Sequence, residues 1–332
     1  MKKFLFGLML VCIVMASCKK EHSKDPGTNK TTHKVVLNVG FSRSTVIFES
    51  NSLKINSLKE NAADTALTNY VEVLYYVVYD SNGNIVHTIK QLSTDSNFGS
   101  YTDNLAAGTY SLIVAAGGQS LILSSDSYGD AYSLSTDVLS YGFNDPVGGG
   151  LQPWHGFSGD TFYKKITLTV TNADVSQGIS LDRITSKLVV NIEDALPANA
   201  KTIYVECSPS YYFHIGSGTA SPTSVDGAGL RIQAIGTVSA AQIGTTNYKV
   251  ALFFLTSAPF SARVYCSSLP PPTDGNVKNI IADRTVPAVT GQPNKVTLLS
   301  GSLFGGATTH STGGFTVSFD TTWNATPITK SF

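Results

Sequence analysis

Charged side chains are scarce in this 332-residue chain, and neither sign predominates. Asp, Glu, Lys and Arg make up 14% of the residues, and the 23 basic and 23 acidic residues give a formal net charge of zero. Proteins that bind nucleic acid present a positively charged face, because contacts to phosphate supply much of the affinity. The composition therefore argues against a nucleic-acid partner.

The sequence also has few residues of the kinds that carry catalysis or hold metals. Its six histidines are scattered, without a His-Glu-x-x-His motif or the paired cysteines typical of a zinc site. Glutamate occurs six times, and no segment indicates the two facing carboxylates of a glycosidase. We therefore expect a protein that is not an enzyme and that uses neither a metal nor another cofactor.

No apolar run reaches the roughly 20 residues that a membrane-spanning helix needs. The N-terminal run, residues 4–14, follows two lysines, and Ala16 and Ser17 place small residues directly before Cys18. A positively charged start, a short apolar stretch and a small-residue cleavage site define a secretory signal peptide, which we assign to residues 1–17. The cysteine at the processing point makes the segment resemble a bacterial lipoprotein signal, in which that cysteine is acylated and becomes the first mature residue.

Residues 18–32 follow as a polar segment rich in Lys, Ser, Thr and Asn. Such a segment has too little apolar surface to fold, so we expect a flexible tether behind the lipid. Lys19, in place of Asp, makes the signal similar to those of lipoproteins sent to the outer membrane. We therefore expect a lipid-anchored protein of the cell outer membrane, exposed at the cell surface.

Cys207 and Cys266 are the cysteines that remain beyond Cys18 in the mature chain, and each ends a predicted strand. An oxidising compartment permits a disulfide between them. Cysteine is also often buried as a free thiol. The spacing leaves both alternatives open.

Alternating apolar and β-branched residues dominate the mature chain, and amphipathic helical patterns are scarce. Strands are expected at residues 34–41, 70–79, 85–92, 111–116, 162–171, 186–193, 202–207, 231–235, 247–255, 260–266, 277–282, 295–299 and 314–320. Many short strands between Gly- and Pro-bearing turns are typical of β-sandwiches. A boundary near Arg183 divides them into two tandem β-sandwich domains, residues 33–184 and 185–332. No internal repeat of fixed period is evident.

Two segments between strands allow a functional and a structural interpretation. Asp80-Ser81-Asn82-Gly83-Asn84 has some residues of a calcium loop but lacks the distal glutamate, so a hairpin turn is favoured. Residues 117–160 exceed the usual length of a structureless loop, and we expect local structure there, including a helical turn over 134–141.

Several stretches recur in this order in fimbrillin-like lipoproteins: 75–84 (YYVVYDSNGN), 105–116 (LAAGTYSLIVAA), 182–194 (DRITSKLVVNIED), 301–304 (GSLF) and 315–323 (FTVSFDTTW). Together they resemble the FimB-type fimbrial anchor family of Bacteroidota type V pili. The resemblance implies two transthyretin-like β-sandwiches and a lipid-anchored subunit at the base of the fibre. It also implies contacts with other fimbrial subunits by donor-strand-type addition, for which the strand at 34–41 is the expected edge.

A surface glycan-binding lipoprotein of a polysaccharide-uptake system is the alternative function. It draws on Tyr128, Tyr132, Tyr141 and Trp154 in the long segment, because exposed aromatic rings stack on sugars. Aromatic residues in β-proteins are more often part of the core.

Overall fold

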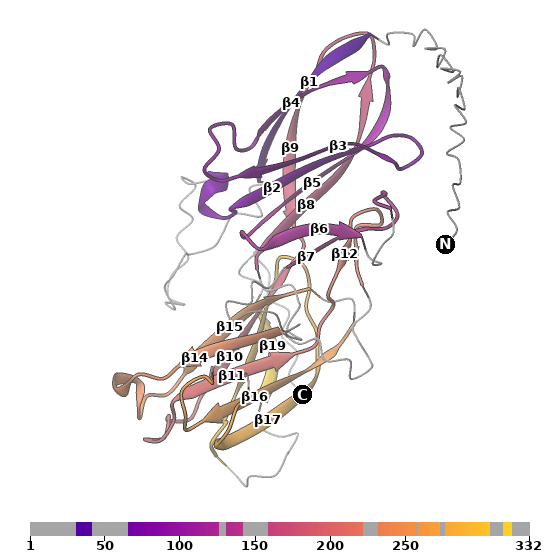
Figure 1. Cartoon of the computed structure of the whole chain (residues 1–332). Coiled ribbons are helices and arrows are strands. Elements are labelled where there is room, and N and C mark those ends of the chain that lie inside the picture. Colours follow the sequence, from indigo (N-terminus) through magenta and orange to yellow (C-terminus); the bar gives the residue numbers. More distant parts are fainter. Residues whose placement is uncertain are drawn as a thin grey trace, which may run out of the picture. The chain divides into compact units, whose positions relative to one another are not determined.

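Strands account for nearly all the regular structure in the described part of this chain (Figure 1). The computed structural model describes residues 31–41, 66–125, 131–141, 159–221, 232–255, 258–272, 276–305 and 315–320. Within these ranges the elements are strands and two 3₁₀ turns, η1 (Leu67–Asn69) and η2 (Ala240–Gln242), which confirms the prediction of an all-β protein. None of these residues forms a helix of the length and apolar character that crossing a bilayer requires.

The strands fall into two series along the chain. The first is β1 (Thr32–Phe41), β2 (Val73–Tyr79), β3 (Ile85–Leu92), β4 (Ser100–Ala106), β5 (Gly108–Gly117), β6 (Leu121–Ser125), β7 (Asp137–Tyr141), β8 (Thr161–Val170) and β9 (Val175–Arg183). The second is β10 (Ser186–Ile192), β11 (Thr202–Cys207), β12 (Phe213–His214), β13 (Thr219–Ala220), β14 (Ile232–Thr237), β15 (Tyr248–Phe254), β16 (Phe260–Ser267), β17 (Ile280–Val289), β18 (Val296–Gly301) and β19 (Phe315–Asp320). β3 and β11 have the predicted bounds, whereas β4, β6, β7, β9, β12 and β13 were not expected.

β7 lies where the sequence indicated a helical turn. The carbonyl of Ser133 accepts hydrogen bonds from the N–H groups of Thr136 (3.1 Å) and Asp137 (2.9 Å), which closes a single turn. From Asp137 onward the chain pairs with β6 on one side and with β12 on the other. The expectation of a helical turn over 134–141 is therefore wrong for β7, because two neighbouring strands satisfy the backbone groups that a helix would satisfy internally.

β1 lies inside a sheet rather than at its edge. It pairs in parallel with β9 and antiparallel with β4, and the order β3-β2-β5-β8 forms the facing part of the sandwich. Side chains from both parts enclose a first core, which includes Leu37, Leu74 and Leu112. The prediction of an open edge at 34–41 is therefore wrong. Because Leu37 is fully buried in a strand paired on both sides, Leu37→Pro would disrupt folding rather than test an interface.

The β3-β2-β5-β8 part of the sheet is covered on its second face as well. Val73, Val77 and Ile113 point away from the first core into a separate cluster, which we call the bridging core. Over it lies a small sheet of order β13-β12-β7-β6, and Figure 1 shows β6, β7 and β12 together. This double burial explains the continuous apolar run at 73–79, because a strand buried on both faces does not alternate.

The bridging core contains residues from both sides of the proposed boundary at 184/185. Phe213, Ile215 and Leu255 belong to the second series of strands and pack with the first series in this cluster. The described parts of Thr32–Phe332 lie in one compact unit, distinct from Met1–Thr31. The two-domain division therefore stays a prediction, with a sheet shared across its boundary.

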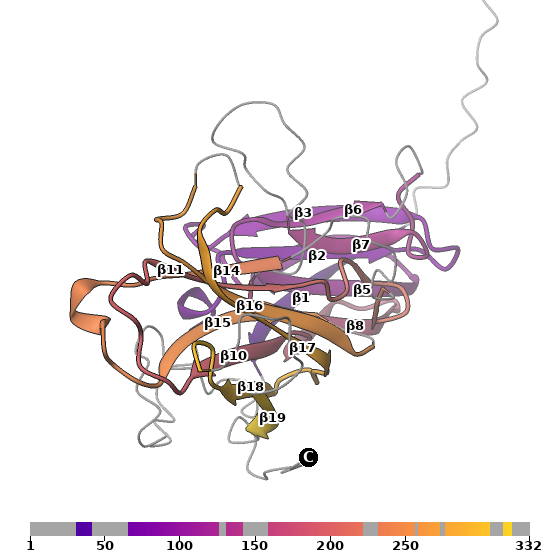
Figure 2. The same cartoon turned by 90° about the horizontal axis from the view of Figure 1, so that it is seen from below.

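Two four-stranded sheets form the second sandwich. Their orders are β15-β10-β18-β19 and β14-β11-β16-β17, and Figure 2 shows β10, β18 and β19 side by side. Leu188 and Val190 from one sheet pack against Ile203 and Val205 from the other in a third core. The alternation of buried and partly buried residues along β18 is what such packing requires.

The two series repeat one topology, which no fixed period in the sequence reveals. β1 pairs antiparallel with β4 and parallel with β9, and β10 pairs antiparallel with β15 and parallel with β18. β2 pairs with β3 and β5, and its counterpart β11 pairs with β14 and β16. In the same way, β5 pairs with β8, and its counterpart β16 pairs with β17. Residues 34–39 (KVVLNV) and 187–192 (KLVVNI) then occupy equivalent strands. Insertions of different length, β6–β7 and β12–β13, hide the repeat in the sequence.

Candidate interaction surface

Sheet edges are the surfaces of this fold that can bind another chain through its backbone. An edge strand presents unpaired N–H and C=O groups, which a further strand can satisfy. Among the described strands, β3 and β4 end the first sheet, and β14, β15, β17 and β19 end the sheets of the second sandwich. β9 is bordered by β8 at only two residue pairs, Phe162↔Arg183 and Tyr163↔Asp182.

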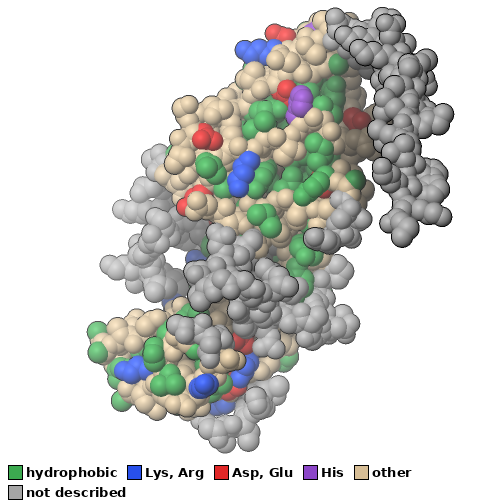
Figure 3. Space-filling view, viewed as in Figure 1, with side chains coloured by type: hydrophobic (Ala, Val, Ile, Leu, Met, Phe, Trp, Pro, Cys, Tyr) green, Lys and Arg blue, Asp and Glu red, His purple; other side chains and the backbone are tan. Residues whose placement is uncertain are grey.

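The β3 edge combines apolar and ionisable side chains. Val86, Ile89 and Leu92 are exposed there, and Figure 3 shows hydrophobic side chains gathered in separate patches among polar surface on this face. His87 Nδ1 lies 2.6 Å from Asp103 Oδ2. Burial opposes ionisation of Asp103, but hydrogen bonds from Tyr101 and His87 outweigh it and lower the pKa of that carboxyl. The polar His87–Asp103 pair blunts this edge, whereas Val86, Ile89 and Leu92 leave apolar side chains exposed along it.

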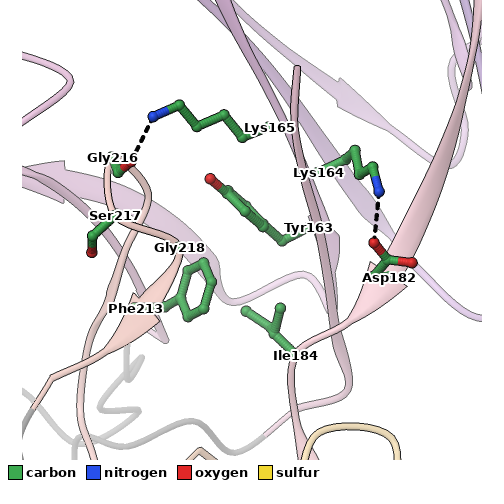
Figure 4. A pocket seen from close by; sticks show the side chains of 9 residues that line it. All are labelled: Tyr163, Lys164, Lys165, Asp182, Ile184, Phe213, Gly216, Ser217 and Gly218. Atoms are coloured by element: carbon green, nitrogen blue, oxygen red, sulfur yellow. Dashed lines mark hydrogen bonds and ion pairs between the residues drawn. The ribbon is translucent and has the colours of Figure 1, made fainter. Parts of the chain in front are cut away.

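A hollow of about 420 Å³ lies where β8 and β9 meet the loop after β12 (Figure 4). Its ammonium groups already have partners: Lys164 Nζ lies 2.8 Å from Asp182 Oδ2, and Lys165 Nζ donates to Gly216 O at 2.6 Å. The rings of Tyr163 and Phe213 pack edge to face at 4.8 Å between centroids, and both side chains are buried. The hollow therefore marks the docking of β12 rather than a platform for a sugar ring.

The aromatic residues of the glycan-binding alternative do not form a platform within the described ranges. Tyr132 is 56% exposed, whereas Tyr141 is buried, and the Tyr141 hydroxyl lies 2.8 Å from Thr161 Oγ1. Tyr128 and Trp154 lie outside the described residues, as does Cys18. Of Tyr132 and Tyr141, the two members of this set that are described, Tyr132 alone has a ring accessible to a ligand.

Asp80-Ser81-Asn82-Gly83-Asn84 forms the hairpin turn that the sequence favoured. Asp80 Oδ1 accepts hydrogen bonds from the N–H groups of Asn82 (2.8 Å) and Asn84 (2.9 Å), and these bonds help to lower the pKa of the Asp80 carboxyl. Gly83 adopts a φ of +82°, which the turn requires. No group of three or more His, Cys, Asp or Glu that could hold a metal occurs in the described part of the chain.

Cys207 and Cys266 are free, buried thiols, so the alternative of a disulfide between them is not formed. They lie on the neighbouring strands β11 and β16, but Cys207 is opposite Ala262 and Cys266 is opposite Ile203. Four residues of register separate them, about 13 Å along a strand, which exceeds the reach of a disulfide. Both belong to the core of the second sandwich.

A buried ionic cluster ties β9 to the turn between β17 and β18. Arg183 Nε lies 2.8 Å from Asp160 Oδ1, and Arg183 Nη1 donates to Asn294 Oδ1 at 2.6 Å. Burial raises the pKa of Asp160 although Arg183 opposes the shift. Thr185 Oγ1 donates to the same carboxylate at 3.0 Å. These side chains fix the junction between β9 and β10, and sequence reasoning had marked only Arg183, as a boundary.

Similarity to known proteins is found by comparing structures. No family model matches it, and no curated protein matches it significantly. A candidate polysaccharide-binding protein (DUF1812) from Bacteroides thetaiotaomicron is similar in structure at 12% identity, over 81% of this chain and 92% of that chain, with a TM-score of 0.51. At this identity the likeness shows the fold alone.

Two further structures have lower TM-scores. A candidate adhesin from Bacteroides ovatus has 10% identity over 87% of this chain and 93% of that chain, with a TM-score of 0.49. The fimbrial anchor protein Mfa2 from Porphyromonas gingivalis has 11% identity over 81% of this chain and 90% of that chain, with a TM-score of 0.47.

Proposed function

We propose that this protein is a lipid-anchored fimbrial subunit, the anchor at the base of a type V pilus, on the surface of the outer membrane. The observation that carries the proposal is the N-terminal order of signal peptide, Cys18 and polar tether, followed by an all-β unit that begins at Thr32. More than one acyl chain on Cys18 would hold the protein on its membrane, because each buried CH₂ contributes about 0.8 kcal/mol. The order of the fimbrillin-like motifs supports the assignment to a fimbria.

Assembly with other subunits would use strand addition at an open edge. A row of backbone hydrogen bonds supplies affinity, and alternate side chains set the register. The buried ion pair of Asp160 and Arg183 and the exposed turn residue Asp80 support a structural role, because each is engaged in hydrogen bonds within the fold. In this proposal the protein holds the fibre on the membrane and catalyses no reaction.

Replacing Cys18 tests the proposal in cells that make the fimbria. We expect Cys18→Ala to move the protein from the membrane fraction to the soluble fraction and to shed fibres into the medium. Cys12→Ala is the matched control, since Cys12 lies within the apolar run of the signal and should leave attachment unchanged. Retention of exported Cys18→Ala protein in the membrane pellet would refute lipid anchoring. Release of the protein with fibres still on the cells would refute the anchor role.

Glycan binding is the second candidate, and the exposed ring of Tyr132 is the observation that favours it. A glycan panel would distinguish the two functions. Binding that Tyr132→Ala abolishes, with fibres unaffected by Cys18→Ala, would favour the surface glycan-binding lipoprotein.

A further inference from the structure

Comparing the two sandwiches identifies an edge of the first one that lacks a strand which the second one has. In the second sandwich β18 pairs with β10 on one side and with β19 on the other. In the first sandwich β9 pairs with β1, the equivalent of β10. Among the described residues, no strand lies beside 175–180 of β9 where β19 lies beside β18.

Residues 175–180 of β9 have no described strand on their outer side because β8 and β9 belong to different parts of the sandwich. β8 and β9 pair only near Phe162 and Tyr163, where Lys164 Nζ also lies 2.8 Å from Asp182 Oδ2. Toward the hairpin turn the strands separate. Ile166 and Val175 there remain partly buried against the first core. An added strand would extend the sheet and cover these apolar side chains.

We propose that this outer edge of β9 accepts an antiparallel strand from a partner fimbrial subunit, in the register that β19 uses on β18. The inference rests on the proposed function for its partner and on the repeat for its geometry. β19 (FTVSFD) indicates the chemistry of the added strand: apolar residues alternate with small polar ones, and Phe315 packs against the core of the second sandwich. The expected donor is therefore a short alternating segment with an aromatic residue near each end.

The repeat also predicts the register of the added strand. Val39 and Ile192 are equivalent, so Ile179, opposite Val39, corresponds to Gly301, opposite Ile192. Gly301 is opposite Phe315, and the neighbouring Ser300 is opposite Thr316. Gly178 of β9 should then lie opposite the donor residue that corresponds to Thr316.

Cysteine cross-linking to a peptide tests both the edge and the register. The probe is a synthetic peptide of residues 313–321 with Thr316→Cys, its sulfur activated as a 2-pyridyl disulfide, so that the protein thiolate forms the new S–S bond and displaces pyridine-2-thione. The protein is the mature chain with Cys18→Ser and Gly178→Cys. An added Cβ at Gly178 meets nothing within 4 Å, so the variant should fold. Gly40→Cys is the matched control: its Cβ also meets nothing within 4 Å, but it lies on β1, one strand further from the edge.

We expect Gly178→Cys to form a mixed disulfide with this peptide about tenfold faster than Gly40→Cys does. A peptide with Val317→Cys, whose thiol would lie on the other face of the added strand, should react with Gly178→Cys at the slower rate. Equal rates, or no cross-link at about 1 mM peptide, would overturn the proposal. Gly178→Cys homodimers formed in preference to the peptide adduct would also overturn it, because they would assign the edge to a second copy of this chain.

The two proposals can fail separately. Fibre shedding by Cys18→Ala without peptide cross-linking would leave the anchor in place and remove this interface. Cross-linking without fibre shedding would keep the edge and remove the anchor.

Discussion

Tyrosine hydroxyls fasten the small sheet to the face that it covers. Tyr75 donates to Leu121 O (3.0 Å), Tyr79 donates to Asp137 Oδ2 (2.6 Å), and Tyr163 donates to Ile215 O. Burial, together with the bond to Asp137, raises the pKa of Tyr79. Each ring is buried while its polar end is satisfied, so the layer is held at defined points.

The free thiol of Cys266 predicts a loss of stability in alkali. Burial raises the pKa of Cys266 to about 11. An unfolded thiol ionises near pH 8.5, so the stability that this group contributes is complete below that pH and is lost as the pH rises through the folded pKa. Between pH 8.5 and 10 we expect the wild type to lose about 2 kcal/mol of unfolding free energy relative to Cys266→Ala in urea titrations.

Thiol reactivity supplies an independent check on the same residue. Native protein should not react with an aromatic disulfide reagent at Cys207 or Cys266 until it unfolds, because burial raises the pKa of both thiols. If the unfolding free energies of the wild type and Cys266→Ala changed equally between pH 8.5 and 10, the predicted loss of stability in alkali would be contradicted. The sequence placed Cys207 at the end of its strand correctly, and Cys266 lies one residue before the end of β16. The four-residue offset between them depends on strand pairing, which spacing alone does not reveal.

At the scale of elements, burial determined which strands the sequence could predict. β2 is buried along its whole length, and its unbroken apolar run is unmistakable. β9 alternates Val175, Ile179 and Leu181 with small polar residues and a glycine, so its pattern is weak. β12 and β13 have two residues each; β12 pairs with β7, and β13 pairs with β12. Short strands specified by tertiary contacts leave little trace in local sequence.

Gly216 predicts how the β12–β13 hairpin depends on close packing. A Cβ at this position would lie 2.0 Å from the carbonyl oxygen of Leu134, so the backbone would have to move. We expect Gly216→Ala to displace the hairpin from β7 and to lower the free energy of unfolding by about 1–3 kcal/mol. Limited proteolysis should then cut within 208–221. Gly178→Ala is the matched control, because its Cβ meets nothing within 4 Å. If both variants resisted proteolysis within 208–221 equally, the close packing of Gly216 against Leu134 would be contradicted.

At the scale of the whole molecule, the shared bridging core bears on whether the first half can fold alone. Its covering side chains include Phe213, Ile215 and Leu255, all beyond residue 184. A fragment of residues 32–184 would keep the first core but expose Val73, Val77 and the other bridging-core residues of β2 and β5. An exposed apolar face of that kind promotes association and loosens packing.

We therefore expect the 32–184 fragment to bind the hydrophobic dye ANS and to unfold at lower urea concentration than the same half within the intact chain. The physical reason is that residues from both halves supply the bridging core, so neither half can bury it alone. Hydrogen exchange of β2 and β5 amides measures the effect directly, because these strands are sheltered on both faces in the intact protein. Amide protection in the fragment equal to that in the intact chain would instead establish two independent domains that meet at residue 184, with β12 and β13 as a dispensable contact.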